Sequence, residues 1–284
     1  MFYLPEIHST SSWLRENYSE QLPHLYTVRT DYQTAGRGQA GNSWESEAGK
    51  NLLCSTLLRH HDLLASEQWR ISMMISLAAR EAISWVLHGI WGATINASTG
   101  LQRDTRWTNE ICDMSSIEVT IKWPNDIYCG DKKLAGILIE NMLMGRYISN
   151  SIVGIGINVN QTIWRSDAPN PISMKQITGE DYDIDILAKT FLSAIERWEK
   201  KSYHELHKEY MSHMYRRKGW HLFLQREVSI EPTSIAPTNE PEAFEACIVD
   251  ITKQGELILQ TRTRERKKYH FKEIRFCVEE HKEH

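Results

Sequence analysis

Residues 122–126 read Lys-Trp-Pro-Asn-Asp, and residues 133–136 read Lys-Leu-Ala-Gly. The Gly130-Asp131 pair between them predicts a tight hairpin turn, which would bring two lysines and a carboxylate into one short hairpin. A lysine that enters a pocket from a strand end needs a carboxylate or phosphate there, because it loses its water. Lys122 is therefore a candidate anion-binding residue, and a surface lysine is the alternative interpretation.

Short apolar runs between turn signals predict strands on both sides of this hairpin. They cover residues 24–32, 51–58, 117–123, 125–129, 134–143 and 147–157. These strands predict a mixed or antiparallel sheet rather than a series of βαβ units. Residues 90–116 lack a helical period and are predicted to be a mobile insertion or a small hairpin, because structureless connections beyond about 12 to 15 residues are uncommon.

Helical spacing of apolar side chains predicts a helix over residues 66–88, with Ser66 as its N-cap. Two further helices are predicted within residues 184–217. After these helices the pattern changes to short strands separated by turns, which predicts a small β-barrel-like domain. We therefore expect two domains, residues 1–218 and residues 219–284.

Charge and composition argue against several classes of protein. The net charge of -4 and the isoelectric point near 6.3 offer no broad basic surface to nucleic acid. The five cysteines are scattered without a CxxC pair, and no HExxH motif is present, so neither disulfides nor a protein metal site is expected. No signal peptide pattern and no apolar run of roughly 20 residues is visible. The sequence predicts a cytoplasmic protein that binds neither nucleic acid nor membranes.

Two glycine-rich segments are candidates for ligand contact. Residues 36–41 match G-x-G-x-x-G, but residues 42–49 give no apolar helical face, so a Rossmann dinucleotide site is not expected. What remains is a flexible loop that carries Arg37 and offers backbone N–H groups to an anion. Residues 154–158 predict a strand interrupted by two glycines, which is typical of close approach by a ligand. An ordinary loop and a β-bulge are the alternatives.

Taken together and in order, these motifs closely resemble those of the biotin protein ligases. The resemblance spans roughly residues 7–160. The residues that carry it are Ser9-Thr10, Gln33-Thr34-Ala35-Gly36-Arg37-Gly38, Trp44, residues 122–126, residues 133–140 (Lys-Leu-Ala-Gly-Ile-Leu-Ile-Glu) and residues 154–158 (Gly-Ile-Gly-Ile-Asn). The β-rich tail agrees with the SH3-like domain that ends proteins of this family.

The resemblance implies a fold class and a reaction. The expected fold is α+β, with a mixed sheet and flanking helices as in class II aminoacyl-tRNA synthetases, plus a small C-terminal SH3-like β-barrel. The expected activity is that of a biotin–[biotin carboxyl carrier protein] ligase. Biotin and MgATP would give biotinyl-5′-AMP and pyrophosphate, and a lysine of a biotin carboxyl carrier domain would then attack the mixed anhydride. The Mg²⁺ would bridge phosphate oxygens with few protein ligands.

The resemblance also implies roles for residues of this chain. Lys122 and Arg37 are expected to be catalytic, because fixed charge stabilises the transition state and a closed loop protects the adenylate. Lys122→Ala is expected to abolish most adenylation. The expected biotin-binding residues are Ser9, Thr10, Ser11, Gln33, Gly36, Arg37, Gly38, Gln39, Lys122, Lys133 and Gly156. The expected nucleotide-binding residues are Arg37, Trp44, Lys122 and Asn158, with Trp44 stacking on adenine.

The chain departs from the family pattern at two places. Many members carry Gly-Arg-Gly-Arg in the loop, whereas this chain has Gln39 at the second arginine position, so we expect it to release biotinyl-AMP more readily. Ser9-Thr10 lies almost at the start, so the helix-turn-helix domain of some members is not expected. A lipoate protein ligase and a non-catalytic biotin- or nucleotide-binding regulator are the alternative functions. Either a monomer or a homodimer is compatible with the sequence.

Overall fold

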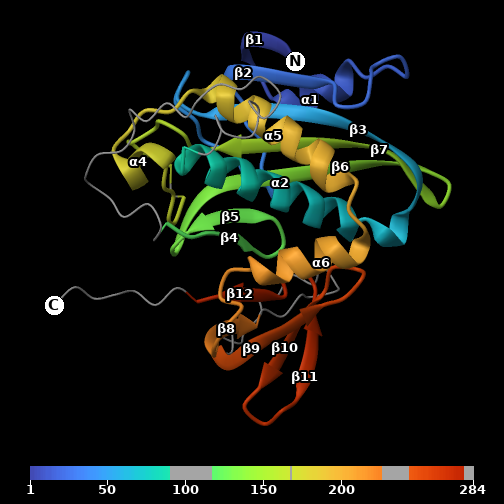
Figure 1. The fold of residues 1–284 in the computed structure, drawn as a ribbon, viewed down its shortest axis with the longest axis vertical. Coiled ribbons are helices and arrows are strands. Elements are labelled where there is room, and N and C mark those ends of the chain that lie inside the picture. Colours follow the sequence, from blue (N-terminus) through green and yellow to red (C-terminus); the bar gives the residue numbers. More distant parts are fainter. Residues whose placement is uncertain (90–116, 167, 226–242, 278–284) are drawn as a thin grey trace, which may run out of the picture.

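The computed structural model of the protein describes residues 1–89, 117–166, 168–225 and 243–277 (Figure 1). The predicted insertion at residues 90–116 lies outside the described residues. Two sheets organise the rest, a large one followed in sequence by a small one. Helices pack against the large sheet and beside the small one (Figure 1), and this arrangement confirms the predicted α+β fold class.

The large sheet has seven strands in the order β1-β2-β3-β7-β6-β5-β4. They are β1 (Phe2–Ile7), β2 (Thr27–Gln33), β3 (Leu52–Leu64), β4 (Val119–Lys122), β5 (Asp126–Cys129), β6 (Lys132–Met144) and β7 (Tyr147–Ile157). The β1–β2 pair is parallel and the other described neighbours are antiparallel, so the predicted mixed sheet is confirmed. Sequence reasoning missed β1, because this mostly exposed edge strand shows no apolar alternation.

Alternation along β3 separates two apolar clusters on the two faces of the large sheet. Leu58 packs in the main cluster, whereas its neighbour Leu57 packs with Leu14 in a second, smaller cluster. The first face is covered by α2 (Trp69–Leu87), α5 (Ile184–Glu199) and α6 (Tyr203–Ser212), and the second by α1 (Thr10–Glu16) (Figure 1). Buried apolar residues therefore lie on both faces of the sheet, which holds its central strands in place beneath the site.

The helix boundaries follow from local signals. α2 begins later than predicted, because Ser66 lies in a 3-10 turn and Gln68 takes the N-cap position. It ends before Gly89, whose φ of 62° is left-handed and stops a helix. The two helices predicted within residues 184–217 are α5 and α6. The short helix α4 (Met174–Thr178) was not predicted.

The small sheet has five strands in the order β11-β10-β9-β8-β12. They are β8 (His221–Gln225), β9 (Ala243–Ile251), β10 (Leu257–Thr261), β11 (Arg266–Tyr269) and β12 (Ile274–Phe276). Because β11 and β12 form its two edges, the described part is an open sheet, and the predicted closed barrel is not confirmed. Phe223 and Ala246 belong to the same buried cluster as α2. In the described part of the chain, no helix is long and apolar enough to cross a membrane.

Candidate active site

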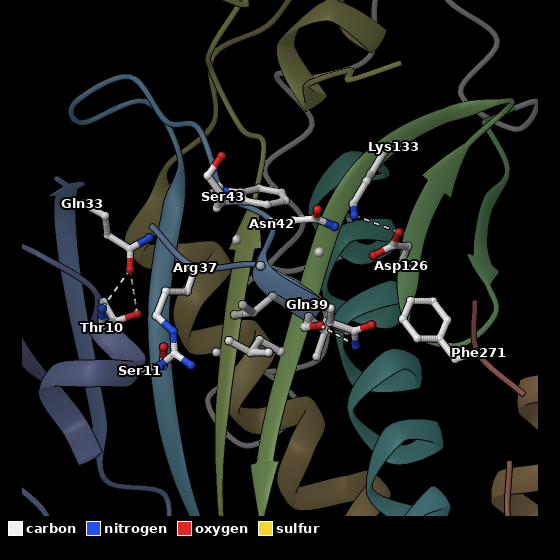
Figure 2. A pocket seen from close by; sticks show the side chains of 18 residues that line it. Thr10, Ser11, Gln33, Arg37, Gln39, Asn42, Ser43, Asp126, Lys133 and Phe271 are labelled. Carbon is white, nitrogen blue, oxygen red and sulfur yellow. Dashed lines mark hydrogen bonds and ion pairs between the residues drawn. The ribbon is translucent and has the colours of Figure 1, made fainter. Parts of the chain in front are cut away.

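A cavity of about 130 Å³ lies over β6 and β7, beneath the loop that follows β2 (Figure 2). Its lining comprises Thr10, Ser11, Gln33, Arg37, Gly38, Gln39, Asn42, Ser43, Trp44, Asp126, Lys133, Gly136, Ile137, Leu138, Gly154, Ile155, Gly156 and Phe271. Most of the predicted site residues are in this lining. The exceptions are Ser9, Gly36, Lys122 and Asn158.

Hydroxyl groups and one amide form one side of the cavity, where Figure 2 shows Thr10, Ser11 and Gln33 together. Gln33 Oε1 accepts hydrogen bonds from Thr10 N at 2.8 Å and Thr10 Oγ1 at 3.1 Å. Ser9 is the N-cap of α1, and its hydroxyl lies 3.1 Å from Ser11 Oγ. Ser9 therefore positions Ser11 from behind, and the bonds from Thr10 leave the N–H groups of the Gln33 amide as donors.

The loop after β2 crosses the cavity and carries Arg37. Trp44 N donates to Gly36 O at 2.9 Å, and this hydrogen bond closes the base of the loop. Gly36 lies at that base and is not part of the cavity lining. Arg37 Nη2 donates to Glu140 Oε1 at 2.7 Å, and Arg15 of α1 pairs with the same carboxylate. Arg37 also donates to Ser12 Oγ at 3.2 Å. The arginine is thus held at the cavity by a carboxylate that has a second cation beside it.

Gln39 fastens the same loop to the hairpin between β4 and β5. Its Nε2 donates to Asn125 Oδ1 at 3.0 Å and to Ile137 O at 3.3 Å. Asn125 Nδ2 donates to the same carbonyl at 3.0 Å. These hydrogen bonds join uncharged groups, so the loop is attached to the hairpin without a charged side chain at residue 39.

Trp44 lies flat against two glycines of the sheet. A Cβ added at Gly136 would lie 2.7 Å from Trp44 Cζ3, and one added at Gly156 would overlap the indole outright. Only glycine therefore lets the ring approach β6 and β7 this closely. Trp44 Nε1 is buried and has no hydrogen-bond partner among the described residues. Trp44, the aromatic residue predicted for the loop, therefore lines the cavity, and its indole N–H has no acceptor among the described residues.

Lys133 reaches the cavity because of a β-bulge. Ile127 pairs with Ala135, whereas the next residue of β5 pairs with Lys133, so β6 carries one extra residue at this point. The bulge allows Lys133 and Gly136, three residues apart, to line the same cavity. Lys133 Nζ lies 2.8 Å from Asp126 Oδ2 and 5.9 Å from the Trp44 ring centroid. The ammonium is therefore fixed in place by a carboxylate at the cavity wall.

Lys122 lies apart from the cavity, at the end of β4, which is the edge strand of the large sheet. Its Nζ donates to Tyr128 Oη at 2.9 Å and lies 4.5 Å from the Tyr128 ring centroid and 5.6 Å from that of Phe276. The pKa of Lys122 is lowered to about 8, chiefly by burial; the Asp126 carboxylate raises it, and nearby cations such as Lys133 contribute to the lowering. The structure does not bring Lys122 together with Arg37, and this geometry argues against contact with a ligand in the cavity.

Asn158 lies just behind the lining, at the end of β7. Its Nδ2 donates to the backbone carbonyls of Lys133 at 3.3 Å and Ile172 at 3.1 Å. Asn158 Oδ1 is buried and has no hydrogen-bond partner among the described residues. A buried acceptor without a donor is costly, so this oxygen marks a place where a ligand donor would be stabilised.

Several lining residues were not among the predicted site residues. They are Asn42, Ser43, Asp126, Gly136, Ile137, Leu138, Gly154, Ile155 and Phe271. Asp126 was part of the hairpin motif without an assigned role, and the glycines of residues 154–158 were a signal for Gly154. Phe271 had no signal, because it comes from the small sheet, far away in sequence.

Residues 3–158, more than half of the chain, match the model of the Biotin/lipoate A/B protein ligase family. The chain belongs to this family. It is 31% identical to the bifunctional ligase/repressor BirA of Bacillus spizizenii over 188 residues, which are 64% of this chain and 48% of that protein. It is 28% identical to the biotin–[acetyl-CoA-carboxylase] ligase of Paracoccus denitrificans over 171 residues, which are 59% of this chain and 60% of that one.

The fold matches a solved structure along nearly its whole length. The biotin protein ligase of Aquifex aeolicus in complex with biotin and ATP superimposes with a TM-score of 0.66 over 97% of both chains, at 23% identity. At that identity the similarity shows a shared fold. In sequence, the match to the Bacillus ligase/repressor spans about half of that relative's length.

Proposed function

We propose that the protein is an ATP-dependent ligase that activates biotin as biotinyl-5′-AMP and transfers it to a lysine of a biotin carboxyl carrier domain. The observation that carries this proposal is the division of the cavity (Figure 2). One side presents neutral hydroxyl and amide groups, and the other presents the Lys133–Asp126 pair. A substrate with a neutral polar head and a carboxylate that reacts with a nucleotide fits this division.

The neutral side is proposed to bind the ureido head group of biotin. Ser11 offers a hydroxyl, and Gln33 offers the N–H groups of an amide whose oxygen Thr10 already occupies. A ureido group both donates and accepts hydrogen bonds and carries no charge, so such partners match it without the desolvation cost of an ion.

Lys133 is proposed to stabilise the charge that develops in the first half-reaction. The carboxylate oxygen of biotin attacks the α-phosphorus of ATP, and pyrophosphate leaves. Negative charge grows on the α-phosphate oxygens in that step. A preorganised ammonium stabilises this charge more strongly in the cavity than it would in water. Its ion pair with Asp126 fixes its position. Arg37, whose partner Glu140 also has Arg15, can turn to the phosphates without leaving that carboxylate unpaired.

The nucleoside is proposed to bind beside Trp44 and Asn158. The indole offers a stacking surface, and Asn158 Oδ1 is a buried acceptor in need of a donor such as the amino group of adenine. Mg²⁺ prefers one or two carboxylates together with phosphate oxygens and water. Asp126 is the carboxylate of the lining that fits this donor set, and the ion, when bound, would neutralise triphosphate charge.

In the second half-reaction the amine of a carrier lysine attacks the acyl carbon of biotinyl-AMP, and AMP leaves. The partner is therefore proposed to be a biotin carboxyl carrier protein, met in the cytoplasm. Residues 1–218 are proposed to form the catalytic domain and residues 219–284 an SH3-like domain. Both parts contribute to the site, since Phe271 joins the lining.

The test is biotin-dependent exchange of labelled pyrophosphate into ATP by the purified protein, followed by the mass of a carrier domain after incubation. Exchange with biotin and a gain of one biotinyl group support the proposal. Exchange with lipoate alone would favour a lipoate ligase. Binding of biotin without any exchange would favour a non-catalytic regulator.

A further inference from the structure

Phe271 is an exposed aromatic residue that the small sheet contributes to the cavity. It lies between β11 and β12, is 48% exposed, and belongs to the lining (Figure 2). Figure 2 shows it on the side of the cavity that holds Asp126 and Gln39, opposite the hydroxyl groups of Thr10 and Ser11. An isolated exposed apolar side chain needs no explanation by itself, but one that forms the wall of a polar cavity does.

The position of Phe271 is defined by a contact with Trp123, a residue that is itself joined to the small sheet. Its ring meets the edge of the Trp123 ring, with the centroids 6.2 Å apart. Trp123 Nε1 donates to Gly255 O of the small sheet at 2.9 Å. Gly255 packs so closely on Trp69 of α2 that an added Cβ would lie 2.7 Å from that ring. The small sheet is thereby fixed to the hairpin that carries Asp126, and Phe271 is presented at a defined place.

The chemistry of a phenyl ring limits what it can do at this wall. It carries no group that transfers a proton or binds phosphate, so it acts by excluding water. Next to Lys133 and Asp126, an apolar ring lowers the local dielectric and strengthens attraction between the ammonium and an anion. It also occupies space from which water would reach a reactive intermediate.

We propose that Phe271 is a pocket-wall residue that protects the acyl-adenylate from hydrolysis. This proposal rests on the proposed function. In the unwanted reaction, a water oxygen attacks the acyl carbon, the bond from that carbon to the phosphate oxygen breaks, and biotin and AMP leave, with the released protons going to solvent. Removing the ring opens the phosphate side of the cavity to that water while Lys133 and Arg37 remain in place.

The experiment compares two rates in the natural protein and in Phe271→Ala: biotin-dependent pyrophosphate exchange, and AMP formation with biotin and ATP in the absence of carrier. We expect the ratio of AMP formation to exchange to rise on the order of tenfold in Phe271→Ala. Phe271→Leu, which keeps an apolar wall, should show a smaller rise. A purely structural role would lower both rates together and leave their ratio unchanged.

Leu222→Ala is the matched control, because Leu222 is a 42% exposed apolar residue on β8 of the same sheet and lies outside the lining. An unchanged ratio in Phe271→Ala, or an equal rise in Leu222→Ala, would overturn the proposal for Phe271 and leave the proposed function standing. Absence of biotin-dependent exchange in the natural protein would overturn both.

Discussion

Lys122→Met separates the two interpretations of the lysine in the hairpin motif. Methionine keeps the apolar stem but removes an ammonium that burial places next to Tyr128 and Phe276. A pKa that falls from 10.5 to about 8 on folding costs the protonated folded protein about 3 kcal/mol, since one pKa unit is worth about 1.36 kcal/mol. Cation–π attraction of about 0.5 to 2 kcal/mol offsets part of this cost. We expect Lys122→Met to be more stable near pH 7 by about 1 to 2.5 kcal/mol.

The sign of the pH dependence follows from where the proton is lost. Below about pH 8 Lys122 is protonated in both the folded and the unfolded chain, so the full cost of burial remains. Between about pH 8 and 10.5 the folded protein has lost the Lys122 proton and the unfolded chain still binds it. The free energy of unfolding of the natural protein therefore rises with pH over this interval. The advantage of methionine over the natural residue should therefore shrink over that interval.

Urea unfolding followed by tryptophan fluorescence, at several pH values from about 7 to 10, measures this difference. Lys253→Met is the matched control, because Lys253 is exposed and lies 5.9 Å from the Tyr203 ring centroid. The control should show no such pH dependence. A stability difference for Lys122→Met that stays constant across this range would refute the reasoning. Lys122→Met should also keep most of its pyrophosphate exchange, and loss of exchange in a folded variant would restore the sequence-based catalytic role.

Three further substitutions test the cavity. Lys133→Met should lower biotin-dependent exchange by about 10²- to 10³-fold, because it removes a fixed charge from the transition state; near-normal exchange would exclude Lys133 from this role. Gly156→Ala places a methyl group against Trp44 and should cost about 1 to 3 kcal/mol of stability and raise the KM for ATP; an unchanged melting temperature and KM would contradict the packing described. Gln39→Arg should slow the release of free biotinyl-AMP, and equal release by both proteins would show that the neutral hydrogen bonds of Gln39 hold the loop equally well.

Sequence reasoning located the hairpin motif and named both of its lysines as site residues, with Lys122 as the catalytic one, whereas the cavity lining contains Lys133 and not Lys122. Lys122 was favoured as the catalytic lysine because it ends a predicted apolar strand, whereas Lys133 precedes one. The bulge that aims Lys133 into the cavity leaves no mark in the alternation of β6, because it is defined by the pairing with β5. Local pattern gives the faces of a strand, but the register between strands decides which side chains meet.

The residues of α1, of the end of β2 and of the loop that follows it were more readily predicted, because their glycines and polar groups form local motifs. Thr10, Gln33 and Arg37 line the same cavity, as expected from these motifs. Phe271 could not be predicted, because its place at the cavity has no local cause in the sequence. Its place at the cavity depends on how the small sheet packs on the hairpin, and no local pattern encodes that packing.

The contact between Trp123 and Gly255 also bears on cooperativity. The boundary near residue 219 is a change of pattern along the chain, but one buried cluster runs from α2 through Trp123 to Phe223 and Ala246. A chain cut at that boundary would expose part of this cluster to water, at roughly 25 cal/mol for each Å² uncovered. The small sheet is therefore part of the scaffold that supports the hairpin with Asp126 and Lys133, and the two parts are expected to gain or lose their structure as one unit.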